Sequence, residues 1–108
     1  LENLSLGENE LVGEIPVEIG NMTNLTYLIL NDNHLSGEIP PEIGNLTNLT
    51  SLDLEYNQLS GVIHGTICDL TLDFTSWRFD ISNNNLCPPY PECISQSDID
   101  SQNTSNCP

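Results

Sequence analysis

The sequence repeats with a period of 24 residues, and this period restricts the fold more than any other feature. Residues 1–24 and 25–48 align without a gap, residues 49–75 open on the same pattern, and residues 76–94 hold a disguised fourth copy. A single unit of this length cannot bury its own apolar face, so neighbouring units must stack on one another. The sequence therefore predicts a solenoid over residues 1–94.

Each unit contains a short stretch in which apolar and polar residues alternate, as they do in a half-buried strand. The apolar pairs are Leu4/Leu6, Leu28/Leu30, Leu52/Leu54 and Phe79/Ile81. When such units stack, their strands form a parallel sheet whose inner face is a continuous core. The far side of that core is expected to be closed by Ile19, Ile43, Ile67 and Ile94.

An asparagine follows each predicted strand at the same position of the unit. Buried polar groups need partners, and a side-chain amide can both accept and donate hydrogen bonds. It can therefore satisfy backbone groups of its own turn and of the neighbouring coil. This reasoning assigns a structural role to Asn9, Asn33, Asn57 and Asn84.

The repeated pattern LxxLxLxxNxLxGxIPxxIGNLTN resembles the plant-type class of leucine-rich repeats. That class occurs in receptor-kinase ectodomains and polygalacturonase inhibitors, and similar arrays exist in secreted microbial proteins. The resemblance implies an α/β-type solenoid: a right-handed superhelix with a parallel β-sheet on its concave face and a mostly irregular or 3-10 convex side. It also implies that a ligand binds mainly on the concave face.

The third and fourth units depart from this pattern. Cys68 replaces a glycine, and about three extra residues lie within 71–75. Ser76 stands where a leucine would open the fourth unit. We therefore expect Phe74 or Trp77 to fill the core at that point.

The four cysteines lie in the C-terminal half, without a CxxC pair or a histidine at metal-ligand spacing. This pattern favours two disulfides in an oxidising compartment over a zinc site. Adjacent coils lie about 4.8 Å apart, so the register favours Cys68–Cys93 among the three possible pairings. Cys87 then pairs with Cys107, and residues 95–108 form a disulfide-bonded C-terminal cap over the last coil.

The charge of the chain excludes several partners. Sixteen acidic residues stand against one basic residue, Arg78, and the net charge is −15. Nucleic-acid binding needs a cluster of Lys and Arg, and an anionic membrane surface has the same requirement. No segment is long enough to span a bilayer. If charge selects a partner, that partner has basic character.

The register also predicts which side chains point outward from the concave strands. Aromatic residues among polar ones on a rigid surface are typical of binding hot spots. The candidate ligand-binding residues are Tyr27, Ile29, Asn31, Asp32, Asp53, Glu55, Tyr56, Trp77, Arg78 and Asp80. The alternative is an ordinary solvated sheet in which Trp77 turns into the core.

Asp53 and Asp80 occupy the same position in adjacent coils, so we expect their carboxylates to lie roughly 5 Å apart. Glu8 and Asp32 repeat this arrangement. Paired carboxylates can perform acid–base chemistry or hold a cation. However, Arg78 is expected to neutralise the first pair, and we recognise no nucleophile, histidine or pocket-forming insertion beside it. We therefore predict no enzymatic activity, no cofactor and no metal site.

The favoured function is an extracellular, secreted or cell-surface module that binds a protein or peptide. Leu1 begins within a repeat, so the chain is expected to be the C-terminal fragment of a longer protein. The alternatives are a role with carbohydrate or cell wall, and ice binding through regular threonine rows such as Thr26/Thr50. Six glycosylation sequons lie at Asn3, Asn21, Asn24, Asn45, Asn48 and Asn103.

Overall fold

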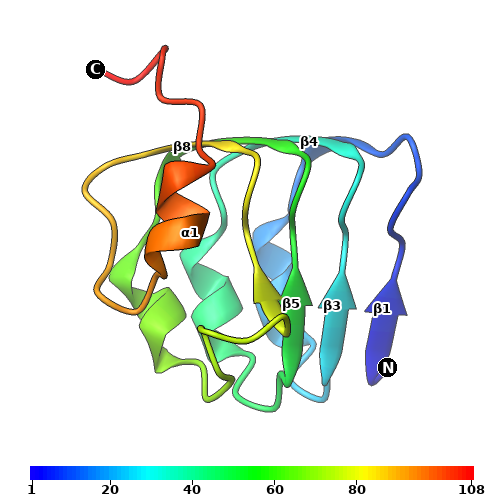
Figure 1. Ribbon diagram of the computed structural model, residues 1–108. Helices are drawn as coiled ribbons and strands as arrows, with labels where there is room; N and C mark the ends of the chain where they lie inside the picture. Colours follow the sequence, from blue (N-terminus) through cyan, green and yellow to red (C-terminus); the bar gives the residue numbers. More distant parts are fainter.

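A computed structural model describes residues 1–108 and shows a stack of coils with two parallel, four-stranded ladders (Figure 1). The strands of the first ladder, in spatial order, are β1 (Asn3–Ser5), β3 (Tyr27–Ile29), β5 (Ser51–Asp53) and β7 (Phe79–Asp80). The strands of the second are β2 (Val12–Glu14), β4 (His34–Gly37), β6 (Gln58–Val62) and β8 (Asn85–Cys87). Each strand pairs with its equivalent in the next coil, which confirms the predicted solenoid.

The convex side carries short 3-10 helices, one in each of the first three coils. They are η1 (Val17–Asn21), η2 (Pro41–Asn45) and η3 (Gly65–Asp69). Stacking brings them so close that a Cβ on Gly44 would lie 2.5 Å from the carbonyl oxygen of Thr66 in the next coil. Only glycine fits such an approach. At the equivalent place in the third coil the chain instead has Cys68, whose sulfur is bonded to Cys93.

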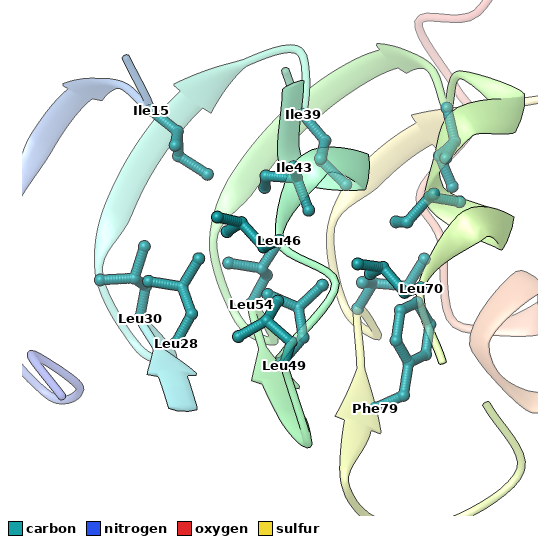
Figure 2. Packing of buried hydrophobic residues seen from close by; sticks show 14 of the residues in the cluster. Ile15, Leu28, Leu30, Ile39, Ile43, Leu46, Leu49, Leu54, Leu70 and Phe79 are labelled. Carbon is teal, nitrogen blue, oxygen red and sulfur yellow. The ribbon is translucent and has the colours of Figure 1, made fainter. Parts of the chain in front are cut away.

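A cluster of 21 buried apolar residues runs through the stack between the strands and the 3-10 helices (Figure 2). Phe74 packs against this cluster, with its ring centroid 4.7 Å from that of Phe79. Trp77 is 78% exposed, so Phe74 rather than Trp77 fills the core at this point, and the alternative in which Trp77 turns inward is wrong. In the first coil, Leu6 and Leu11 are 40% and 37% exposed, because no coil packs on that side of them.

The buried asparagines join each coil to the one before it. The Asn57 side-chain oxygen accepts the Leu35 N–H at 3.0 Å. Its amide nitrogen donates to the carbonyls of Leu30 and Leu54, at 2.9 and 3.1 Å. Asn33 and Asn84 make equivalent bonds. Asn9 is exposed and donates only to carbonyls of its own turn.

Two disulfides close the C-terminal end: Cys68–Cys93 joins the third coil to the fourth and Cys87–Cys107 ties the tail to the fourth, each with a Cα–Cα distance of 5.7 Å. This is the pairing that the register favours. The helix α1 (Gln96–Asp100) lies beside the last coil (Figure 1). The Ser95 side chain begins this helix by accepting a hydrogen bond from the Asp98 N–H.

Side chains of the tail replace the backbone that a further coil would supply. In the interior, the Leu54 N–H donates to the Asp80 carbonyl. At the end of the stack, the Ile81 N–H donates to the Asp98 carboxylate instead. The tail repeats this substitution for two more donors: the Asn83 N–H donates to Ser101 Oγ and the Leu86 N–H to Gln102 Oε1. Gln102 also donates to the Ile81 carbonyl, so it acts as the asparagine of a missing coil.

The asparagine bonds predict a difference between two chemically identical substitutions. Asn57→Ala leaves the buried Leu35 N–H without a partner and removes one of the two amide bonds to each of the Leu30 and Leu54 carbonyls, and we expect it to lower the free energy of unfolding by about 2 kcal/mol. Asn9→Ala removes bonds that water can replace, and we expect a loss below about 1 kcal/mol. Urea unfolding of both variants measures the difference; equal losses would show that the amide does not join the coils.

Candidate functional site

The concave face is formed by the outward side chains of β1, β3, β5 and β7. Strand pairing places Tyr27 beside Ser51, Ile29 beside Asp53, and Asp53 beside Asp80. Side chains at the same position of neighbouring coils therefore lie side by side, as the 24-residue repeat predicts. The most concentrated feature of the concave face is a group of acidic side chains on the last two strands and the turns that follow them.

Three carboxylates meet there. Ligand oxygens of Asp53, Glu55 and Asp80 all lie within 4.8 Å of one another, and the three side chains are half-buried. Local bonds hold two of them: the Glu55 N–H donates to Asp53 Oδ1 at 3.1 Å, and the Ser82 N–H donates to Asp80 Oδ1 at 2.9 Å. Hard cations such as Ca²⁺ prefer oxygen ligands of this kind, but they take six or more of them. Three carboxylates would need water or a partner to complete such a shell.

The cluster shifts the acidity of its members. A hydrogen bond between the Glu55 carboxyl and Asp80 raises the pKa of Glu55 to about 7, and burial and the Asp80 charge act in the same direction. Burial also raises the pKa of Asp53, against the opposing effect of its bond from the Glu55 N–H. The charges of Asp80 and Asp32 raise the Asp53 pKa further. The cluster therefore holds unbalanced negative charge.

Arg78 does not neutralise this charge, contrary to the expectation from sequence. Its guanidinium carbon lies 4.8 Å from the ring centroid of Trp77 and stacks on that side chain. The one contact between a basic and an acidic side chain joins His64 Nε2 to Glu38 Oε1, at 3.3 Å, and does not involve the cluster. The carboxylate cluster has no cationic partner within the chain.

The remaining candidate residues lie on the same strands and the turns beside them, and three of them are exposed aromatic residues. Tyr27, Tyr56 and Trp77 are 39%, 54% and 78% exposed. Asn31 donates to Asp32 at 2.7 Å. The structure thus brings Asp53, Glu55 and Asp80 together and pairs Trp77 with Arg78, while Tyr27 and Ile29 share β3 and Tyr56 lies in the turn after β5.

Ser51 differs from its expected exposure. The alternation along β5 places its side chain on the same outward side as Asp53, but Ser51 is only 2% exposed, with its hydroxyl oxygen free of any hydrogen-bond partner. In the register it lies beside the larger Tyr27 of β3. A small residue beside a large one is covered here even on an outward face.

Sequence reasoning also missed a hollow of about 300 Å³ between β7 and the tail, which we call the cap hollow. Its walls are Phe74, Thr75, Ser76, Trp77, Phe79, Asp80, Ser82, Ser95, Ser97 and Asp98. The expectation that no pocket-forming insertion accompanies the acidic pair is therefore wrong. Part of one wall comes from the extra residues of 71–75, and this departure from the repeat was the available signal.

The sequence and the fold of this chain are both similar to those of known proteins. The profile of the family described as "Leucine Rich repeats (2 copies)" matches residues 23–64, and that described as "Leucine Rich Repeat" matches residues 1–22. The fold is similar to the BIR2 ectodomain from Arabidopsis thaliana, with 38% identity, a TM-score of 0.77, and coverage of 83% of this chain and 46% of that one. Curated protein sequences gave no significant match.

Two further solved structures are similar to this chain, one described with a bound peptide hormone and the other as an ice-binding protein. One is the Arabidopsis receptor kinase HAESA ectodomain in complex with an IDA peptide hormone: 42% identity, TM-score 0.74, 84% of this chain and 15% of that one. The other is a plant ice-binding protein: 35% identity, TM-score 0.72, 80% of this chain and 27% of that one. The chain thus spans less than half the length of each of these relatives.

The relatives and the cysteines give a consistent cellular setting. BIR2 and HAESA are described as ectodomains, and two disulfides fit an oxidising compartment. None of the helices combines the length and the apolar character that crossing a membrane requires.

The raised pKa of Glu55 predicts how stability depends on pH. Between its ordinary value of 4.5 and about 7, the folded chain binds more protons at this site than the unfolded chain does. Stability is therefore fully present below that window and falls as pH rises through it. We expect the loss of Tm from pH 5 to pH 8 to be smaller in Glu55→Gln than in the unmodified chain.

Glu18→Gln is the matched control for this measurement, since Glu18 is exposed on the convex side. It should leave the pH dependence of Tm unchanged. An identical loss of Tm in Glu55→Gln and in the unmodified chain would contradict the hydrogen bond between the Glu55 carboxyl and Asp80 that raises the pKa of Glu55.

Proposed function

The chain belongs to the leucine-rich repeat family, with repeats of the plant type, and we propose that it is a non-enzymatic extracellular module that binds a basic protein or peptide. The ligand lies on the concave face, across β3, β5 and β7. In this proposal residues 1–94 are the repeat array and residues 95–108 are its cap. The array supplies a rigid surface and the cap ends it.

The observation that carries the proposal is the uncompensated carboxylate cluster. Asp53, Glu55 and Asp80 face outward within 4.8 Å of one another and have no cationic partner in a chain of net charge −15. The hydrogen bond to Asp80 and burial raise the pKa of Glu55, and repulsion from Asp80, Asp53 and Asp32 adds to that shift. A basic group from a ligand would relieve that repulsion, and the overall charge would speed its approach.

Exposed aromatic and aliphatic side chains provide the apolar part of the surface. Tyr27 and Ile29 lie on β3, with Ile29 beside Asp53, while Tyr56 follows β5 and Trp77 precedes β7. Tyr and Trp bury large areas at low entropic cost, which makes them frequent anchors of binding energy. The combination fits a peptide that has both basic and apolar side chains.

The relatives support the class of ligand without naming this chain's own. The HAESA ectodomain is described in complex with a peptide hormone, and it shares 42% identity with this chain. A location outside the cell is consistent with ectodomain relatives and with two disulfides. All six sequon asparagines are exposed, so glycosylation at each is sterically open.

Ice binding gains less support from the threonine rows. The hydroxyl of Thr26 donates to the Glu2 carbonyl, and the hydroxyl of Thr50 donates to the Thr26 carbonyl. Thr71 bonds to Thr47 in the same way. These hydroxyl hydrogens link coils rather than face water as a regular free array.

A peptide selection against the immobilised chain tests the proposal. We expect the selected peptides to be enriched in Lys and Arg, and their affinity to fall when salt is raised from about 50 to 300 mM. Tyr27→Ala should weaken binding about tenfold, as loss of a hot-spot anchor does. Glu18→Gln, on the convex side, should leave binding within about twofold.

Two results would contradict the proposed function. One is selection of neutral or acidic peptides. The other is binding that Glu18→Gln weakens as much as Tyr27→Ala does, because that would place the ligand away from the concave face.

A further inference from the structure

The cap hollow lies where the concave face meets the tail. One wall is the outward side of β7, with Asp80 and the following Ser82. The opposite wall is the start of α1, with Ser97 and Asp98. The segment before β7 forms the rim, with Trp77 as its most exposed member. With about 300 Å³, the hollow lies at the small end of ligand sites and has room for one side chain rather than a whole ligand.

The hydroxyl groups of the hollow have already used their hydrogens. Ser82 Oγ donates to Asp80, and Ser95 Oγ donates to Asp98 Oδ2. Because the Ser95 hydrogen is used in this way, the contact between Ser95 Oγ and Ser97 Oγ must be donated by Ser97. Ser95 Oγ also accepts the Asp98 N–H, so its lone pairs are used, whereas Ser82 and Ser97 keep lone pairs that face the hollow.

The two hydroxyls of the rim are committed in the same way. Thr75 Oγ1 donates to Asp73 Oδ1, and Ser76 Oγ donates to the Asp73 carbonyl. The indole N–H of Trp77 is the one side-chain donor left among the lining residues. The hollow consequently accepts hydrogen bonds but has little capacity to donate them, so its ligand must be rich in N–H or O–H donors.

The charge of the hollow selects among such donors. Asp80 and Asp98 both line it, and no lining residue is cationic. Asp98 is only 6% exposed; burial raises its pKa, and the charge of Asp80 adds to that shift. Donors that also carry positive charge satisfy the lone pairs and the carboxylates together.

Trp77 adds an aromatic surface to the rim. Arg78 already stacks on this ring at 4.8 Å, yet the side chain is 78% exposed. A guanidinium or ammonium group gains from contact with an indole face. The aromatic wall, the acceptor-only lining and the paired carboxylates all fit the same chemical group.

We propose that the cap hollow is a subsite for one guanidinium or ammonium side chain, an Arg or Lys of the basic partner. This proposal rests on the proposed function. The backbone of the partner follows the concave face, and one of the partner's basic side chains enters the cap hollow at the end of that face. N–H groups of the ligand donate to Asp80 and to the oxygens of Ser82 and Ser97. The departure of residues 71–75 from the repeat builds the rim of this subsite.

Amide resonances of the ¹⁵N-labelled chain, titrated with small probes, test the subsite directly. N-acetylarginine amide and N-acetyllysine amide represent the two sources, and the tighter one identifies the preferred side chain. We expect both to shift residues 74–82 and 95–98. N-acetylcitrulline amide lacks the charge and N-acetyl-trimethyllysine amide lacks the N–H donors, so each should bind about tenfold more weakly.

Variants assign the effect to the hollow. Asp80→Asn and Trp77→Ala should each weaken binding of N-acetylarginine amide about fivefold. Glu92→Gln changes the same charge on an exposed residue outside the hollow and should stay within about twofold. Because Trp77 is exposed, its replacement tests the subsite even if Asp80→Asn perturbs folding.

Three outcomes would overturn the subsite. They are an absence of shifts with both cationic probes, equal binding of the trimethylated probe, and shifts confined to β3 and β5. The last would leave the proposed function standing, since basic groups would still bind the concave face. A basic peptide titrated in parallel separates the two: its failure to bind would contradict the proposed function itself.

Discussion

The bond network of a buried asparagine amide holds this molecule together. One such side chain accepts an N–H from the coil before it and donates to carbonyls of both coils, as Asn57 does. A coil that slipped by one residue would leave these buried groups unpaired, at about 1–3 kcal/mol each. The 24-residue period is therefore fixed by hydrogen bonding as well as by apolar packing. The register in turn aligns side chains of adjacent coils, and the carboxylate cluster around Asp53 and Asp80 is a direct consequence.

The need to pair buried backbone groups also explains the conformation of the tail. The last coil presents backbone donors that no further coil accepts, and Asp98, Ser101 and Gln102 accept them with side chains. To do so, α1 must lie beside β7 at the end of the concave face. The cap hollow is the space left between them. Completion of the hydrogen bonds thus places two carboxylates of different elements, Asp80 and Asp98, around one opening.

The repeat made the strands, the buried asparagines and the position of Asp53 beside Asp80 predictable, because each depends on register alone. The contact made by Arg78 was not predictable, because a long side chain on a surface can reach several partners. Here it stacks on Trp77. The role of Gln102 was also hidden, because the tail has no repeat against which to align it. The cap hollow needs both the extra residues of 71–75 and the tail, and neither follows the period.

The central claim is that side chains of the tail replace a missing coil, and hydrogen exchange of single amides tests it most directly. The amides of Ile81, Asn83 and Leu86 donate to tail side chains, whereas those of Leu54, Tyr56 and Leu59 hold the same positions one coil earlier. If the tail completes the stack, each amide of the first group is protected to within about tenfold of its counterpart, because both open only when the end of the array opens. Exchange of Ile81, Asn83 and Leu86 at the rate of an unstructured chain, with the interior group protected, would contradict the claim.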